Sequence, residues 1–226
     1  PGKHWKAYLE ESGHSLQAYL RSLEFLGQDI AKAHAVSLPS YGDIVSATSI
    51  QPAGVTNFAT RLEHIFSLKL LKAKSVLSAG EFEQVKTDFK GGVQSLVEQL
   101  EKEKYPPVLV LTNLHPMNFL VDQQGKPSGY PDLEFSQAGV KALEMYNMGL
   151  QLFSYFDQPT FDVAKNAFFK GYTAEGGVYD SDDGTNKKLE ALLCAGHTLS
   201  AVTAYHGARD GLRDAWGEKF KKILFD

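Results

Sequence analysis

Several classes of protein are excluded by what this 226-residue sequence has little of. Its one cysteine, Cys194, leaves no disulfide framework and no cysteine-ligated metal cluster. No apolar run approaches the roughly 20 residues of a membrane-spanning helix. The formal net charge of −4 comes from 23 basic and 27 acidic residues that are mixed along the chain, so no basic surface for nucleic acid is expected. These absences predict a cytoplasmic protein without a nucleic-acid or membrane partner.

What the sequence does contain is a large amount of helical patterning. Hydrophobic residues make up 43% of the chain and charged residues 22%, which is typical of a folded domain with a sizeable core. Apolar side chains recur at three- and four-residue spacing, which predicts helices. The predicted helices cover residues 15–37, 56–74, 78–104, 140–156, 160–172, 188–205 and 209–226. Residues 38–55 carry Pro, Gly and Ser and are predicted to form an ordered loop.

One stretch, residues 108–134, has a different pattern. Two short apolar runs, 108–111 and 119–121, are separated by polar residues and followed by a Gln-Gln-Gly-Lys turn and a further polar cluster that ends at Asp132. This pattern predicts a small β-hairpin with polar loops inside a helical chain. Because loops on a rigid scaffold often carry function, binding or catalysis is expected here.

The polar residues of this stretch allow two interpretations. Asn113, Asn118 and Asp132 provide amide and carboxylate oxygens, the hard ligands that suit Mg²⁺. Alternatively, the hairpin is structural and these side chains satisfy backbone groups of turns. A separate acidic segment, which contains Asp180, Asp182 and Asp183, lacks the glutamate of a calcium-binding loop and is interpreted as a structural turn.

The segment LTNLHPMNFLVDQQGKPSGYPDLEFSQAG resembles the catalytic core of the aminoglycoside phosphotransferase and choline kinase-like family. That family has His-Gly-Asp-Leu-His-Pro-x-Asn, then a strand, a turn and a hydrophobic-Asp-Phe/Trp-Glu sequence. The upstream LGQDIAKAHAVSLP resembles the family's Leu-x-x-Leu-His-Ala helix end. The resemblance implies a mainly helical α+β fold, the C-terminal lobe of a protein kinase-like enzyme. Residues 1–107 and 135–226 would then be helical, with a catalytic hairpin at 108–134.

The resemblance also implies roles for single residues. Asn118 and Asp132 would hold Mg²⁺ that bridges the phosphates of ATP. His115 would shape the catalytic loop. Glu144 lies where the family often has an aspartate that braces this loop, although the polar stripe of its helix is equally consistent with a solvated side chain. The implied activity is ATP- and Mg²⁺-dependent phosphorylation of a hydroxyl on a small molecule, and the mildly acidic composition favours a cationic substrate.

The sequence departs from the family pattern at the catalytic position. Asn113 lies where the family has its catalytic aspartate, and Leu111 lies where the family has histidine. A carboxamide accepts no proton, and loss of a general base costs about 10²–10⁴ in rate. Asn113 is therefore either natural, in a pseudokinase-like binding or scaffold domain, or the product of an engineered Asp→Asn change. A third possibility is a purely helical interaction domain in which the hairpin is structural.

No phosphate-covering loop or ATP-positioning lysine of the family's N-terminal lobe is found in the sequence. The opening Pro-Gly resembles the segment that follows the hinge between the two lobes. We therefore expect the chain to be a C-terminal lobe whose partners are a nucleotide, a small-molecule substrate and its own N-terminal lobe.

Overall fold

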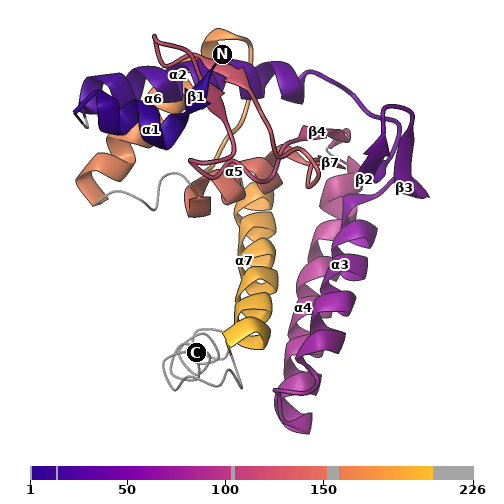
Figure 1. Ribbon diagram of the computed structural model, residues 1–226. Helices are drawn as coiled ribbons and strands as arrows, with labels where there is room; N and C mark the ends of the chain where they lie inside the picture. Colours follow the sequence, from indigo (N-terminus) through magenta and orange to yellow (C-terminus); the bar gives the residue numbers. More distant parts are fainter. Residues whose placement is uncertain (1, 14, 103–104, 152–157, 206–226) are drawn as a thin grey trace. The chain divides into compact units, whose positions relative to one another are not determined.

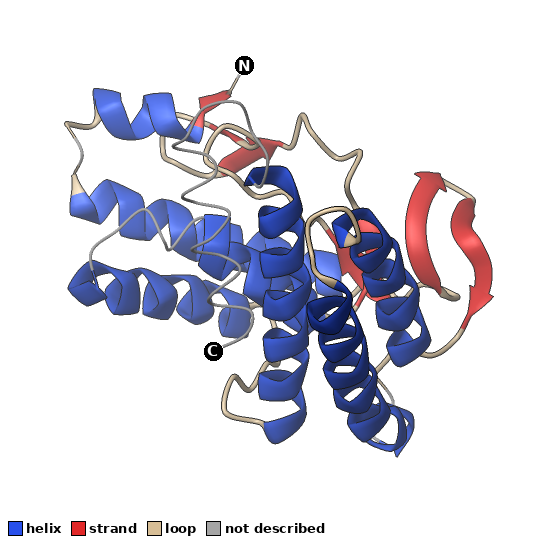
Figure 2. Ribbon diagram, turned by 90° about the horizontal axis from the view of Figure 1, so that it is seen from below, coloured by secondary structure: helices blue, strands red, loops and turns tan. Residues whose placement is uncertain are grey.

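The computed structural model describes residues 2–13, 15–102, 105–151 and 158–205 (Figure 1). The chain divides into two compact units, one formed by Pro1–Thr56 and Pro106–Asp180 and the other by Asn57–Tyr105 and Ser181–Asp226. Helices predominate and the strands form two small antiparallel sheets (Figure 2), which confirms the predicted mainly helical α+β class. None of the described helices is long and apolar enough to span a bilayer. The helix predicted for 209–226 lies outside the described residues.

The first unit contains four helices: α1 (Trp5–Glu11), α2 (Leu16–His34), α5 (Lys141–Gln151) and α6 (Gln158–Ala174). The side chain of Ser15 accepts a hydrogen bond from the Ala18 N–H and caps α2. Helices α2 and α6 pack closely because each has a glycine at the contact. A Cβ on Gly27 would lie 2.1 Å from the Phe168 carbonyl oxygen, and one on Gly171 would lie 1.8 Å from that of Glu24.

One hydrophobic core joins these helices to residues 108–134, the central stretch of the sequence. Trp5 at the start of α1 is 1% exposed, stacks on Phe119 with ring centroids 5.1 Å apart, and donates from Nε1 to the Ser22 hydroxyl at 2.7 Å. The remaining fully buried members of this core come mainly from α2, the central stretch and α6, and include Leu23, Leu26, Ile30, Leu114, Val121, Met148, Ala164, Phe168 and Tyr172. The polar loops of the central stretch are thus held on a packed base.

The first sheet contains the predicted hairpin turn. Strands β5 (Leu120–Val121) and β6 (Pro127–Gly129) pair, and β1 (Lys3–His4) adds to β5. The turn is closed by a hydrogen bond from the Asp122 N–H to the Lys126 carbonyl oxygen at 2.9 Å, and Gly125 has a φ of 82°. Glycine adopts this left-handed conformation without steric cost, which explains the Gln-Gln-Gly-Lys sequence.

The second sheet corrects two predictions. Its order is β3 (Ser49–Val55), β2 (Tyr41–Ser46), β7 (Gln137–Gly139) and β4 (Val108–Val110). The loop predicted for residues 38–55 is therefore wrong, because this segment forms a hairpin that is completed by pairing with β7. The first apolar run, β4, does not pair with β5 as the simple hairpin required, but with β7. The two pairings with β7 join residues that are distant in sequence, so local patterns gave no sign of them, whereas β2 and β3 pair across a short turn.

The second unit contains α3 (Phe58–Ala73), α4 (Ala79–Lys102) and α7 (Gly184–Tyr205), with α3 packed on both other helices. The predicted capping box of α4 is present: the Ser78 N–H donates to the Glu81 carboxylate at 2.8 Å, and the Glu81 N–H donates to the Ser78 hydroxyl at 3.3 Å. Asp183 Oδ1 accepts from the N–H groups of Thr185 and Asn186 and caps α7. Asp183 of the acidic turn thus has a structural role.

Candidate functional site

Three of the residues singled out in the sequence meet at one carboxylate. Asp132 Oδ2 accepts hydrogen bonds from the side-chain amides of Asn113, at 2.9 Å, and Asn118, at 3.1 Å. The Asn118 amide also donates to the backbone carbonyl oxygen of Asn113 at 3.2 Å. All three side chains are partly buried, so they form a polar cluster at the edge of the core. This Asn113–Asn118–Asp132 cluster is the candidate site.

The tight turn at 115–118 positions Asn118. The Asn118 N–H donates to the His115 carbonyl oxygen at 2.7 Å, and the Met117 N–H donates to His115 Nδ1 at 3.3 Å. In this bond the Nδ1 atom of His115 is the acceptor. Beside the turn, the Lys6 N–H donates to the Pro116 carbonyl oxygen. His115 therefore lies where it holds the turn rather than in the cluster itself.

Thr112 was not singled out in the sequence, yet its backbone is unusual. Its φ of 60° makes it the one non-glycine residue in the described part of the chain with a positive φ. A β-branched residue rarely adopts this conformation, which costs about 1–2 kcal/mol. The Asn113 N–H donates to the Leu111 carbonyl oxygen across Thr112 and closes a three-residue turn. The family pattern has glycine at this position, and that was the signal in the sequence for a left-handed residue.

Two hydrogen bonds hold Thr112 in this conformation. Its hydroxyl donates to the Phe135 carbonyl oxygen at 2.6 Å, and its N–H donates to Glu144 Oε1 at 3.1 Å. The first bond ties the loop before Asn113 to the segment after Asp132. The strained residue thus connects the two chain segments that form the cluster, as is common for backbone strain near functional sites.

Glu144 is the acceptor beneath the loop. It is fully buried, in the first turn of α5, and its other oxygen accepts from the Leu111 N–H at 2.6 Å. Burial raises the pKa of this carboxyl group to about 7, while the two backbone hydrogen bonds act in the opposite direction. The solvated side chain that the polar stripe allowed is therefore wrong. Glu144 has the geometry of a brace for the loop, because one carboxylate fixes two consecutive backbone N–H groups.

A second buried polar pair lies at the end of α2. His34 Nδ1 and the Tyr172 hydroxyl are 2.8 Å apart, and both residues are buried. Burial and the nearby Lys141 ammonium lower the pKa of His34 to about 3, so its imidazole is neutral at physiological pH. His34 belongs to the helix end that resembles the family's Leu-x-x-Leu-His-Ala sequence, and it acts here as a core residue that joins α2 to α6.

The chain matches no family profile and no curated protein at the level of sequence. Its fold is similar to that of an aminoglycoside phosphotransferase, APH(2″)-IIIa, solved in complex with GDP and kanamycin. The two chains superpose with a TM-score of 0.52 at 16% sequence identity, over 91% of this chain and 62% of the other. The present chain thus spans about three fifths of that enzyme's length. The likeness shows that this chain has the mainly helical α+β, kinase-like fold that the sequence predicted.

Proposed function

We propose that this chain is the C-terminal lobe of a kinase-like phosphotransferase, which holds Mg²⁺ and the phosphates of a nucleoside triphosphate at Asn118 and Asp132. The observation that carries the proposal is the convergence of these two side chains, whose polar atoms lie 3.1 Å apart, from the two ends of the β5–β6 hairpin. Mg²⁺ takes few protein oxygens and fills its remaining positions with water and phosphate oxygens. A carboxylate beside a carboxamide therefore fits the ion.

The present hydrogen bonds also fit such a site. The Asp132 carboxylate receives two amide donors where a cation would otherwise balance its charge. The Asn118 amide presents its nitrogen to Asp132, and a turn of the amide group would present Oδ1 to the metal instead. When bound, Mg²⁺ would neutralise phosphate charge, while the turn at His115 and the brace at Glu144 keep the side chains in place.

Asn113 would orient the acceptor hydroxyl of a small molecule, because a carboxamide both donates and accepts hydrogen bonds. Phosphoryl transfer depends mainly on positioning and charge neutralisation, so slow transfer is compatible with a neutral group there. ATP is the nucleotide expected from the sequence, and the GDP in the similar structure makes GTP the second one to test. A small hydroxylated and cationic substrate is consistent with the net charge of −4.

Calorimetric titration of the chain with Mg-ATP and Mg-GTP tests the proposal. Binding is expected, and the double substitution Asn118→Ala and Asp132→Ala should weaken it by at least about tenfold, because both proposed oxygen ligands are lost. Asn166→Ala, which changes an exposed amide on α6, is the matched control and should bind as the parent does. Equal binding by the parent and the double variant would overturn the proposal.

The alternative is a pseudokinase-like domain that binds or scaffolds without transfer. The observation that favours it is Asn113 itself, whose amide donates to Asp132 instead of offering a carboxylate to the substrate. Asn113→Asp, assayed for nucleotide turnover with a panel of hydroxyl compounds, distinguishes the two functions. Turnover that rises by about 10²–10⁴ supports the phosphotransferase. No turnover in either form, with nucleotide binding retained, supports the binding domain.

A further inference from the structure

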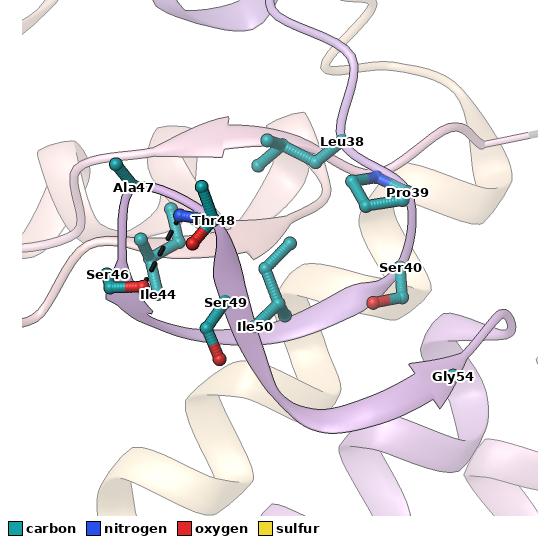
Figure 3. Close-up of a pocket in the computed structure, with 10 residues that line it drawn as sticks. All are labelled: Leu38, Pro39, Ser40, Ile44, Ser46, Ala47, Thr48, Ser49, Ile50 and Gly54. Carbon is teal, nitrogen blue, oxygen red and sulfur yellow. Dashed lines mark hydrogen bonds between the residues drawn. The ribbon is translucent and has the colours of Figure 1, made fainter.

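A cavity with a volume of about 520 Å³ lies beside the β2–β3 hairpin (Figure 3). This volume lies within the range of small-molecule sites, roughly 300–1,000 Å³. Residues from the segment after α2, from both strands and from the turn between them line it: Leu38, Pro39, Ser40, Ile44, Ser46, Ala47, Thr48, Ser49, Ile50 and Gly54. None of them belongs to the Asn113–Asn118–Asp132 cluster, so the cavity needs an explanation of its own.

The base of the cavity is apolar. Ile44 and Ile50 are direct partners across the two strands, so their side chains project from the same face of the hairpin. Leu38 and Pro39 line the same space, and Figure 3 shows the four side chains around it. Ile44 and Ile50 are only half-buried, so an apolar occupant would remove more of their surface from water.

The hydroxyl groups around this base are available for hydrogen bonds. Within the described residues, no hydrogen bond engages the side chains of Ser40, Thr48 or Ser49. Ser46 Oγ accepts one from the Thr48 N–H at 3.3 Å, drawn as a dashed line in Figure 3, and its own proton is not used by that bond. Each hydroxyl can donate and accept, so together they suit the polar edge of a ligand.

None of the described residues that line the cavity has an ionisable side chain. The neighbours of Ile44 along β2, Asp43 and Val45, are exposed and do not line the cavity. An ion against this apolar base would lose hydration without gaining a countercharge. The chemistry therefore selects an uncharged occupant.

We propose that this cavity binds an uncharged small molecule with an apolar body and hydrogen-bonding groups at its edge. The site is separate from the proposed phosphotransferase site, although both border one sheet: β2 pairs with β7, which follows Asp132, and β7 pairs with β4, which leads to Leu111. Neither a metal nor a nucleotide takes part, so the two proposals stand or fall independently.

The test is a titration of the ¹⁵N-labelled full chain with 2-naphthol, an uncharged probe with an apolar body and one hydroxyl, followed by amide chemical shifts. Saturable shifts are expected at residues 38–50. The charged analogue 2-naphthoate, of similar size, should bind at least about tenfold more weakly, because its carboxylate meets no countercharge. Absence of saturable shifts, shifts confined to other elements, or equal binding of the two probes would overturn the proposal.

Two substitutions on adjacent residues give a matched pair. Ile44→Asp places a charge in the cavity and should weaken 2-naphthol binding at least about tenfold. Val45→Asp places the same charge on an exposed residue that does not line the cavity and should leave affinity within about twofold. If the Ile44 variant loses the β2 amide signals, Ser49→Tyr, which fills the cavity from its edge, replaces it with the same expected loss. Unchanged binding in the cavity variant, or equal losses in the Ile44 and Val45 variants, contradicts the site.

Discussion

The buried carboxylate of Glu144 accepts a hydrogen bond from the backbone N–H of Thr112, the residue whose φ of 60° turns the chain toward Asn113. The buried carboxylate thus fixes the backbone conformation of the loop before Asn113. The consequence is that the position of Asn113 depends on a residue 31 places further along the chain, beyond both small strands of the hairpin. Five predictions test this arrangement and the packing around it.

Glu144→Ala should destabilise the chain by about 2–4 kcal/mol, because two backbone N–H groups lose their acceptor and a cavity is left in the core. Urea unfolding at neutral pH measures the change, and hydrogen exchange should accelerate at Leu111 and Thr112. Glu10→Ala, on the exposed face of α1, is the control and should lie within about 0.5 kcal/mol of the parent. A Glu144 variant as stable as this control would show that the brace contributes nothing.

Stability should depend on the titration of Glu144. Its pKa is raised from 4.5 to about 7 in the folded chain, so the folded state binds this proton more tightly than the unfolded chain. The group therefore contributes stability that is fully present below pH 4.5 and is lost as the pH rises to about 7. Glu144→Gln removes this titration.

The measurement is the difference in unfolding free energy between the parent and the Glu144→Gln variant across this pH range. The difference should fall by up to about 3 kcal/mol as the pH rises and be flat above neutrality. The pKa of His34 is lowered to about 3, so its titration has the opposite effect on stability. Because His34 is present in both proteins, its contribution cancels in the difference. A pH-independent difference would contradict the raised pKa.

At Thr112, glycine should be better tolerated than alanine. Thr112→Gly relieves the left-handed strain but loses the hydroxyl bond to Phe135, two effects of about 1 kcal/mol each that nearly cancel. Thr112→Ala loses the bond and keeps the strain. Chemical denaturation should therefore place the glycine variant about 1–2 kcal/mol above the alanine variant. The reverse order would mean that the positive φ carries no cost.

The contact of α2 with α6 should not tolerate a methyl group. A Cβ at Gly27 or Gly171 would lie far inside contact distance of a backbone carbonyl on the other helix, so either Gly→Ala change should cost about 3 kcal/mol or more. Thermal unfolding measures this. Gly149→Ala in α5 meets no atom within 4 Å and should instead stabilise by about 0.5–1 kcal/mol. Equal effects at the three glycines would contradict the close helix contact.

Asn113→Asp should make the stability of the chain depend on Mg²⁺. The change replaces a hydrogen bond of 2.9 Å to Asp132 with repulsion between two carboxylates, which lowers stability by about 1 kcal/mol or more without metal. Added Mg²⁺ should restore the loss in a thermal-shift assay, whereas Asn166→Asp on the exposed face of α6 should show no such response. A metal response equal to that of the control would argue against a cation at the cluster.

Much of the helical framework was readable from the sequence because its signals are local. The capping box of Ser78 and Glu81 and the turn at Gly125 depend on residues within four positions of one another, and both are present. The hairpin at 41–55 was missed although β2 and β3 pair locally, with Ile44 opposite Ile50. Its Pro, Gly and Ser residues favour a loop locally, and only pairing of β2 with the distant β7 completes the sheet.

The sequence by itself determined the helical periodicity, the spacing of Asn113, Asn118 and Asp132, and the resemblance that indicated a phosphotransferase fold. The tertiary structure alone decided that these three side chains share one carboxylate and that Glu144 is buried rather than solvated. The physical reason is that a helix is stabilised by groups four residues apart, whereas the environment of a polar side chain is set by whatever the fold packs against it.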